Sequence, residues 1–133
     1  MSPLFTKMLS GEIRCHRLAE TDRSVAVLEP SPLADGHTLV FPRSPVDWIY
    51  DLEDADLKDL LSLSKRIAHA QRRTVACDKI ALAAYGLKVR HAHLHLVPVN
   101  GKPGEFDLTR PRPEADDDAL ALMAERIRSA LGA

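Results

Sequence analysis

Hydrophobic and polar residues alternate between two kinds of pattern along the chain, short apolar stretches and longer stretches with helical spacing. Three short stretches rich in apolar or β-branched residues lie early in the sequence, at 14–19, 24–28 and 37–41. A turn at 21–23 and a loop at 30–36 with prolines and a glycine separate them. We expect these three strands to form an antiparallel meander because their connections are short.

Apolar residues recur every three or four positions in three other stretches, which predicts helices over 4–10, 52–72 and 115–131. The longest of them carries its apolar face on Leu57, Leu60, Leu61, Ile67 and Ala68. Asp51 or Asp54 is expected to cap its start. The last helix begins after a run of aspartates, and these favour a helix N-terminus.

Two further strands are predicted over 79–84 and 89–99, and the second contains the most unusual pattern in the chain. His91–Pro98 (HAHLHLVP) places three of the six histidines at alternate positions. On a strand, alternate side chains share a face about 6.5–7 Å apart. His91, His93 and His95 are therefore expected on one face, with Ala92, Leu94 and Leu96 against an apolar layer on the other.

Length and composition limit the classes of protein that fit. The 133 residues predict a single domain over 1–133, with 115–131 as an appended C-terminal helix. The net charge is −1 and basic residues are scattered, so we expect no nucleic-acid partner. The apolar runs are too short to cross a membrane, and the start lacks a signal-peptide core, so a cytoplasmic location is expected. Cys15 and Cys77 are then expected to be reduced.

The histidine stretch permits three interpretations. A purely structural role is disfavoured, because protonated neighbours depress one another's pKa at a cost in stability. A zinc-dependent hydrolase is the second, since two histidines at i and i+2 can share one Zn²⁺, with His37 as a further ligand. Three consecutive same-face histidines cannot easily reach one ion, however, and no acidic residue nearby completes the set.

The third interpretation is nucleophilic catalysis at phosphorus by His93. Neutral imidazole predominates near pH 7, because its ordinary pKa is about 6.5. Attack on a phosphoryl group would form a phosphoramidate and divide one difficult displacement into two easier steps. His93 has a histidine on each side, one to stabilise charge or pass a proton and one to orient the ring.

Three segments of the chain resemble the histidine triad family. His91–Val97 (HAHLHLV) fits its pattern of three histidines separated by apolar residues. Residues 4–13 (LFTKMLSGEI) are similar to its opening segment, and 28–43 (LEPSPLADGHTLVFPR) to its Gly-His-Thr-Leu-Val segment. The three segments occur in the family's order and span most of residues 4–99.

This resemblance implies an α+β fold, with a five-stranded antiparallel sheet, one long helix and a C-terminal helix, extended across a homodimer. It also implies a nucleotide hydrolase or transferase that needs no cofactor. Such enzymes cleave a nucleoside monophosphate, here expected to be AMP, from a phosphoramidate, an acyl-adenylate or a dinucleoside polyphosphate. The expected partner is therefore a purine nucleotide.

The resemblance also implies roles for individual residues. His93 would become nucleotidylated, and His95 would contact the phosphate and help protonate the leaving group. His91 would orient His93 through its backbone carbonyl, and His37 would support the cluster from the neighbouring strand. The residues expected to bind the nucleotide are Glu29 at the ribose, and Phe5, Met8, Ile13 and Val27 around the base; ordinary core packing is an equal alternative for the last four.

The segment before the histidines departs from the family pattern. Residues 84–90 (AYGLKVR) lack the Asn, Gln and Ser that bind phosphate in relatives, and Leu87 and Lys88 stand at the Gln and Ser positions. Lys88 is a candidate phosphate contact, although its strand parity turns it away from the histidines and favours a solvated side chain. Because these ligands are missing, a catalytically weak nucleotide-binding regulatory module stays open as an alternative. Pro3 and Thr6 replace a zinc-binding cysteine pair, so no metal site is expected.

Overall fold

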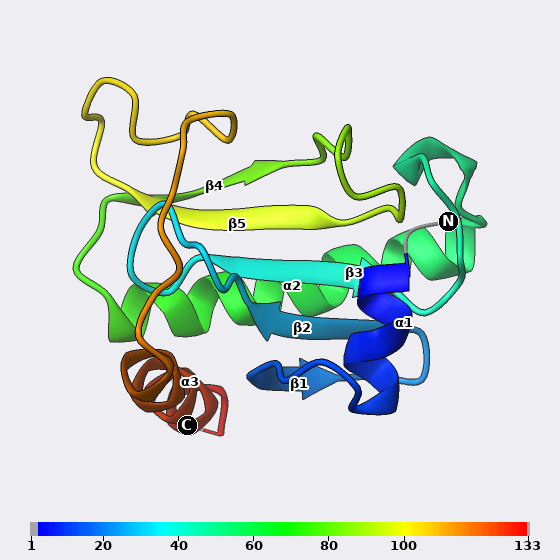
Figure 1. Ribbon diagram of the computed structural model, residues 1–133, viewed down its shortest axis with the longest axis horizontal. Coiled ribbons are helices and arrows are strands. Elements are labelled where there is room, and N and C mark those ends of the chain that lie inside the picture. Colours follow the sequence, from blue (N-terminus) through cyan, green and yellow to red (C-terminus); the bar gives the residue numbers. More distant parts are fainter. Residues whose placement is uncertain (1–2, 133) are drawn as a thin grey trace.

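The computed structural model describes residues 3–132, which form a five-stranded antiparallel sheet with helices on both faces (Figure 1). The strand order is β1-β2-β3-β5-β4. The elements in chain order are α1 (Pro3–Ser10), β1 (Arg17–Glu20), β2 (Ser24–Leu28), β3 (Thr38–Pro42), the 3₁₀ turn η1 (Ile49–Asp51), α2 (Asp54–Thr74), β4 (Lys79–Ala83), β5 (Leu94–Val99) and α3 (Asp117–Leu131). The α+β fold, the five strands, the long helix and the C-terminal helix expected from the sequence are thereby confirmed.

Strands β1, β2 and β3 form the expected antiparallel meander. The chain then passes along α2 before it returns as β4 and β5, and β5 inserts between β3 and β4. This insertion brings the histidine segment beside β3, where Leu39 pairs with His95.

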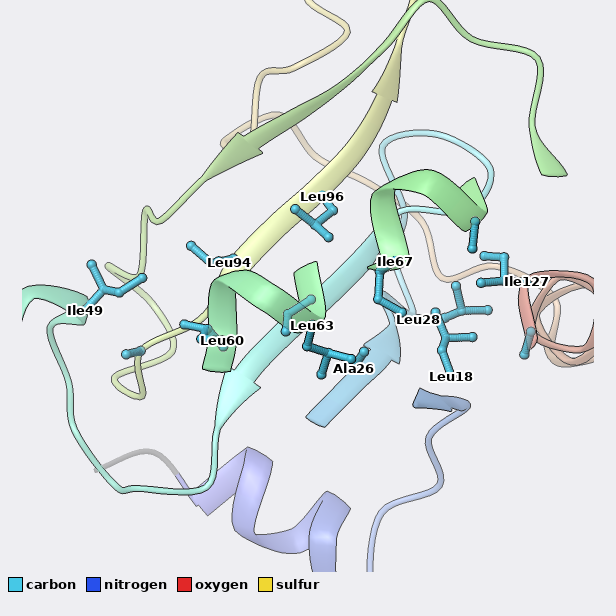
Figure 2. Packing of buried hydrophobic residues seen from close by; sticks show 14 of the residues in the cluster. Leu18, Ala26, Leu28, Ile49, Leu60, Leu63, Ile67, Leu94, Leu96 and Ile127 are labelled. Carbon is cyan, nitrogen blue, oxygen red and sulfur yellow. The ribbon is translucent and has the colours of Figure 1, made fainter. Parts of the chain in front are cut away.

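The two faces of the sheet carry separate apolar clusters, because alternate residues of each strand point to opposite sides. One cluster joins Ala26, Val40 and Leu94 to the buried face of α2. Figure 2 shows Leu60 and Ile67 of α2 directed toward the sheet in this cluster. The other cluster consists of Phe5 and Met8 of α1 with Val25, Val27, Leu39 and Phe41 of the sheet.

The alternation also places the histidines. Ala92, Leu94 and Leu96 belong to the cluster under α2, as the sequence pattern predicts. His93 and His95 therefore lie on the opposite face, the one that α1 covers in part. The rings agree, since that of Phe5 in α1 meets that of His93 edge to face with centroids 5.3 Å apart.

Three local expectations are wrong. Strand β5 begins at Leu94 rather than at residue 89, because the N–H of Ala92 donates to the carbonyl of Val46 (2.7 Å) instead of extending the sheet. Strand β1 begins at Arg17 rather than at residue 14. The residue at the N-cap of α2 is Glu53, which caps without a side-chain hydrogen bond, so neither Asp51 nor Asp54 has the capping role.

A long tail, residues 100–116, crosses the sheet on the α1 side before α3 begins (Figure 1, yellow to orange). The N–H of Ala115 donates to the carbonyl of Pro30 (2.9 Å), which fixes the tail beside the loop after β2. Asp116 then caps α3 by accepting the N–H of Ala119. Helix α3 packs against α2 and β1, and none of the helices within residues 3–132 has the length and apolar character of a membrane span.

Candidate active site

Four histidines gather on the face of the sheet that α1 partly covers. His37 directly precedes β3, His91 and His93 lie in the segment just before β5, and His95 lies within β5. Each is at most 8% exposed. The rings of His93 and His95 have centroids 4.9 Å apart, and those of His37 and His95 lie 5.2 Å apart. The three histidines of the motif are thus brought together with His37.

A chain of hydrogen bonds determines which nitrogen of His95 carries a proton. The backbone N–H of Leu33 donates to Nδ1 of His37 (3.0 Å), so the proton of neutral His37 is on Nε2. That Nε2–H donates to Nδ1 of His95 (3.0 Å). In neutral His95 the proton is therefore on Nε2, and this N–H is the ring donor left for a ligand.

The opposite assignment holds for His93. Its Nδ1 lies 2.7 Å from the carbonyl oxygen of His91, and a carbonyl only accepts, so Nδ1 carries the proton. Nε2 of neutral His93 then has a free lone pair. His91 is itself fixed by donation from its Nε2 to the carbonyl of Pro42 (2.7 Å). In the cluster, the nucleophilic Nε2 of His93 therefore lies beside the Nε2–H donor of His95.

All four imidazoles are held in the neutral form. The pKa of His37 is lowered to about 3, mainly by burial and then by the charges of His95 and Arg112. The pKa of His95 also falls to about 3, through burial first and then through His93 and Arg112. Burial likewise lowers the pKa of His91 and of His93, against the opposing effect of their carbonyl partners. At neutral pH His93 is consequently available as a nucleophile.

The cluster opens onto a pocket of about 540 Å³, a volume typical of small-molecule sites. His93 and His95 line this pocket, whereas His37 and His91 lie outside its lining and contact the lining histidines. Phe5, Met8 and Ile13 form part of its apolar wall. Val27, in contrast, is fully buried in the cluster with Phe5 and Phe41 and does not line the pocket.

Glu29 lies in the same lining and pairs with an arginine that the sequence did not single out. Nη2 of Arg112 donates to Oε1 of Glu29 (3.2 Å), and both side chains are about 15% exposed (15% and 14%). Burial raises the pKa of Glu29, although the charge of Arg112 opposes this. Arg112 belongs to the tail, which has no periodic pattern, and only its proline-flanked position (PRP) marks it in the sequence.

Lys88 also lines the pocket, with an exposed side chain. Because β5 begins at Leu94 rather than at residue 89, strand parity does not determine the direction of the Lys88 side chain. Leu87 lines the pocket as well and supplies no polar group for a phosphate.

The sequence pattern also did not reveal Asp117, whose carboxylate lies in the pocket lining at the start of α3. Nε2 of His16 and Nη1 of Arg14 each lie 2.9 Å from the carboxylate of Asp117. These contacts tie α3 to the segment before β1. The distance of about one hundred residues between the partners explains why no local pattern reveals them.

Metal-binding geometry is absent from the part of the chain that the structure describes. Within residues 3–132 no three His, Cys, Asp or Glu side chains are arranged to hold an ion. Both ring nitrogens of His37 are occupied by hydrogen bonds within the protein, which leaves it unsuited as a ligand. Cys15 and Cys77 are free thiols.

Comparisons with known proteins agree with the fold and the motif. A family model described as HIT domain matches residues 10–102. An adenosine 5'-monophosphoramidase of Schizosaccharomyces pombe is 34% identical over 132 residues, which cover 97% of this chain and 98% of that protein.

Two solved structures resemble the whole chain. A hypothetical histidine triad nucleotide-binding protein of Sulfolobus tokodaii has a TM-score of 0.85 at 23% identity, over 97% of this chain and 91% of that one, and supports the fold alone. A zinc-bound histidine triad family protein of Mycobacterium smegmatis has a TM-score of 0.78 at 26% identity, over 97% and 92% of the two chains.

Proposed function

This chain belongs to the histidine triad (HIT) family, and we propose that it is a nucleotide hydrolase that releases AMP from a phosphoramidate through a covalent intermediate on His93. One observation carries the proposal. Nε2 of His93 has a free lone pair beside the Nε2–H donor of His95, and both rings line one pocket. The name of the fungal relative, an adenosine 5'-monophosphoramidase, supports this substrate class.

In the first step Nε2 of His93 attacks the phosphorus, and the bond from phosphorus to the leaving nitrogen breaks. The carbonyl of His91 accepts the Nδ1–H of His93 and stabilises the positive charge that develops on that ring. His95 donates its Nε2–H to the phosphate or the leaving atom and helps protonate the latter. In the second step water attacks the phosphorus and gives its proton to Nε2 of His95, the bond from phosphorus to Nε2 of His93 breaks, and AMP is released with both rings restored.

The remaining pocket residues bind the nucleoside. Glu29 is placed to accept hydrogen bonds from the ribose hydroxyls, and Phe5, Met8 and Ile13 form apolar walls for the base. Acyl-adenylates and dinucleoside polyphosphates present the same AMP group, so they are further candidate substrates.

The direct test is to incubate the protein with adenosine 5'-phosphoramidate and to measure AMP by chromatography, with and without a chelator. We expect turnover in both conditions and a nucleotidylated His93 in mass spectra of the quenched protein. Activity that disappears with the chelator and returns with zinc would instead support a zinc-dependent hydrolase. Binding of AMP without turnover of any of the three substrate classes would identify a regulatory module.

We also propose that two chains pair through the sheet edge formed by β4. One side of β4 bonds to β5, and its outer side is the sheet edge. Leu82 in this strand is 50% exposed and Tyr85 just after it is 51% exposed. Light scattering should give the dimer mass for the native chain and the monomer mass for Leu82→Glu. A native monomer at all concentrations would contradict the proposal.

A further inference from the structure

A guanidinium group lies inside the pocket that is proposed to bind AMP. Arg112 comes from the tail and lines the pocket together with His93, His95 and Glu29. Its side chain is 15% exposed, so most of its hydration is lost. Burying a charge costs free energy, and pairing with a carboxylate offsets part of that cost. The position therefore needs an explanation beyond a surface charge.

The hydrogen bonds of Arg112 leave much of its binding capacity unused. Nη2 donates to Oε1 of Glu29 and Nη1 donates to the carbonyl of Leu108, each at a distance of 3.2 Å. Charge-assisted bonds are commonly shorter, about 2.7–2.9 Å, so these contacts hold the group loosely. A guanidinium has five N–H donors in a planar fork that fits two phosphate oxygens. Two of those donors have partners among residues 3–132.

Arg112 also lies close enough to the histidines to affect their protonation. Its charge contributes to the lowered pKa of both His37 and His95. The positive charge of Arg112 also acts at the place where a bound phosphate would accept the Nε2–H of His95, and it would stabilise the negative charge of that phosphate.

We propose that Arg112 binds the phosphate of the nucleotide and takes the place of the Asn, Gln and Ser that are missing from residues 84–90. The ribose hydroxyls occupy the carboxylate of Glu29, and the released guanidinium turns its fork to the phosphate oxygens. Arg112 is thus a specificity residue that favours phosphorylated nucleosides over nucleosides. This inference rests on the proposed function, because it assumes that the pocket binds AMP.

The competing explanation is that Arg112 only ties the tail to the protein. Arg110 provides the matched control, since it lies on the same tail and donates to the carbonyl of Leu33 (3.1 Å). Its side chain is exposed and does not line the pocket. A tail-fixing role is therefore shared by both arginines, whereas a phosphate contact belongs to Arg112 alone.

The test is calorimetric titration of AMP and of adenosine into the native chain, Arg112→Gln, Arg112→Lys and Arg110→Gln. We expect Arg112→Gln to weaken AMP binding about 10- to 100-fold, as for the loss of hydrogen bonds to a charged group. Adenosine binding should change less than about 3-fold, because adenosine has no phosphate and so loses no charged hydrogen bond to Arg112. Arg112→Lys should retain part of the AMP affinity, since it keeps the charge without the fork. Arg110→Gln should alter neither ligand.

Equal losses for AMP and adenosine in Arg112→Gln, or the same loss in Arg110→Gln, would overturn the inference. The adenosine titration also reports whether each variant is folded, and Arg112→Lys provides a second variant if Arg112→Gln is not. Failure of the proposed function has a different signature. In that case the native chain binds AMP with the expected dependence on Arg112 but turns over no AMP-containing substrate.

Discussion

Both faces of the sheet bury apolar side chains, but against very different helices. On one face the 21-residue α2 covers the sheet with Leu60, Leu63 and Ile67. On the other face the 8-residue α1 covers part of the sheet, and the pocket of about 540 Å³ lies beside it. The α2 face is therefore devoted to stability, and the α1 face exposes polar groups to a ligand. Substitutions on the two faces should separate these two roles.

The largest effect is expected from His93→Ala on the α1 face. Loss of the nucleophile should reduce turnover of adenosine 5'-phosphoramidate by at least about 10⁴-fold. The free energy of unfolding, measured in urea, should fall by about 1–3 kcal/mol, because the buried ring loses its hydrogen bond to the carbonyl of His91 and its contact with Phe5. His69→Ala is a suitable control, since that histidine is exposed on α2. Equal activity of the two variants would remove the basis of the proposed mechanism.

Ile67→Ala should have the reverse effect on the α2 face. This side chain is fully buried, and its truncation leaves a cavity that costs about 2–5 kcal/mol of unfolding free energy. The turnover number of the folded fraction should stay near the native value. Leu61→Ala on the same helix is the control, because Leu61 is 46% exposed and its loss should cost far less.

The α1 face should make stability depend on pH. His37 and His95 have a folded pKa of about 3 against about 6.5 when unfolded, so the unfolded chain binds more protons below pH 6.5. The part of the unfolding free energy that depends on these two rings being neutral is fully present above pH 6.5. It is lost as the pH falls toward 3. The unfolding free energy should decline by at most about 2.7 kcal/mol per pH unit from these two groups. Chemical denaturation between pH 7 and 4 measures the slope.

His37→Gln should flatten this pH dependence, since it removes one of the two titrating groups. Ile67→Ala lowers stability without touching the histidines, so its slope should match that of the native chain. An unchanged slope in His37→Gln would show that other groups dominate acid unfolding.

The smallest effect is expected from Glu29→Gln. The amide keeps one acceptor for the ribose but loses the charge, so AMP should bind about 10-fold more weakly. Calorimetric titration of AMP and 2',3'-dideoxyadenosine monophosphate measures the difference. The dideoxy ligand lacks the hydroxyls and should bind the variant no more weakly than the native chain. Equal losses for both ligands would place Glu29 away from the ribose.

The sequence predicts best what depends on local alternation. The positions of Ala92, Leu94 and Leu96 against α2 follow from residue parity alone, and so does the common face of His93 and His95. Parity also holds at Ala92 and His93, just before β5, although the strand itself begins later than expected. Ala92, just before the strand, bonds to Val46, and such a long-range bond leaves no trace in local spacing.

Contacts between distant segments were beyond the sequence pattern. Arg112 reaches Glu29 across 83 positions, and its tail has neither strand nor helix periodicity. The interval from His16 to Asp117 is longer still. For Val27 the discrepancy is the opposite one. Strand alternation places it on the pocket face of the sheet, but α1 covers it there and it belongs to the apolar cluster. Each depends on how α1 and the tail pack against the sheet.

Main-chain groups determine which ring nitrogen of His93 and of His95 carries the proton. A peptide N–H at Leu33 can only give a proton to a hydrogen bond, and a peptide carbonyl at His91 can only receive one. These two backbone groups fix opposite proton positions on the two rings. The carbonyl acts on His93 directly, and the N–H acts on His95 through the ring of His37. Substituting His37 would therefore release the proton position of His95, whereas that of His93 would stay fixed by the main chain.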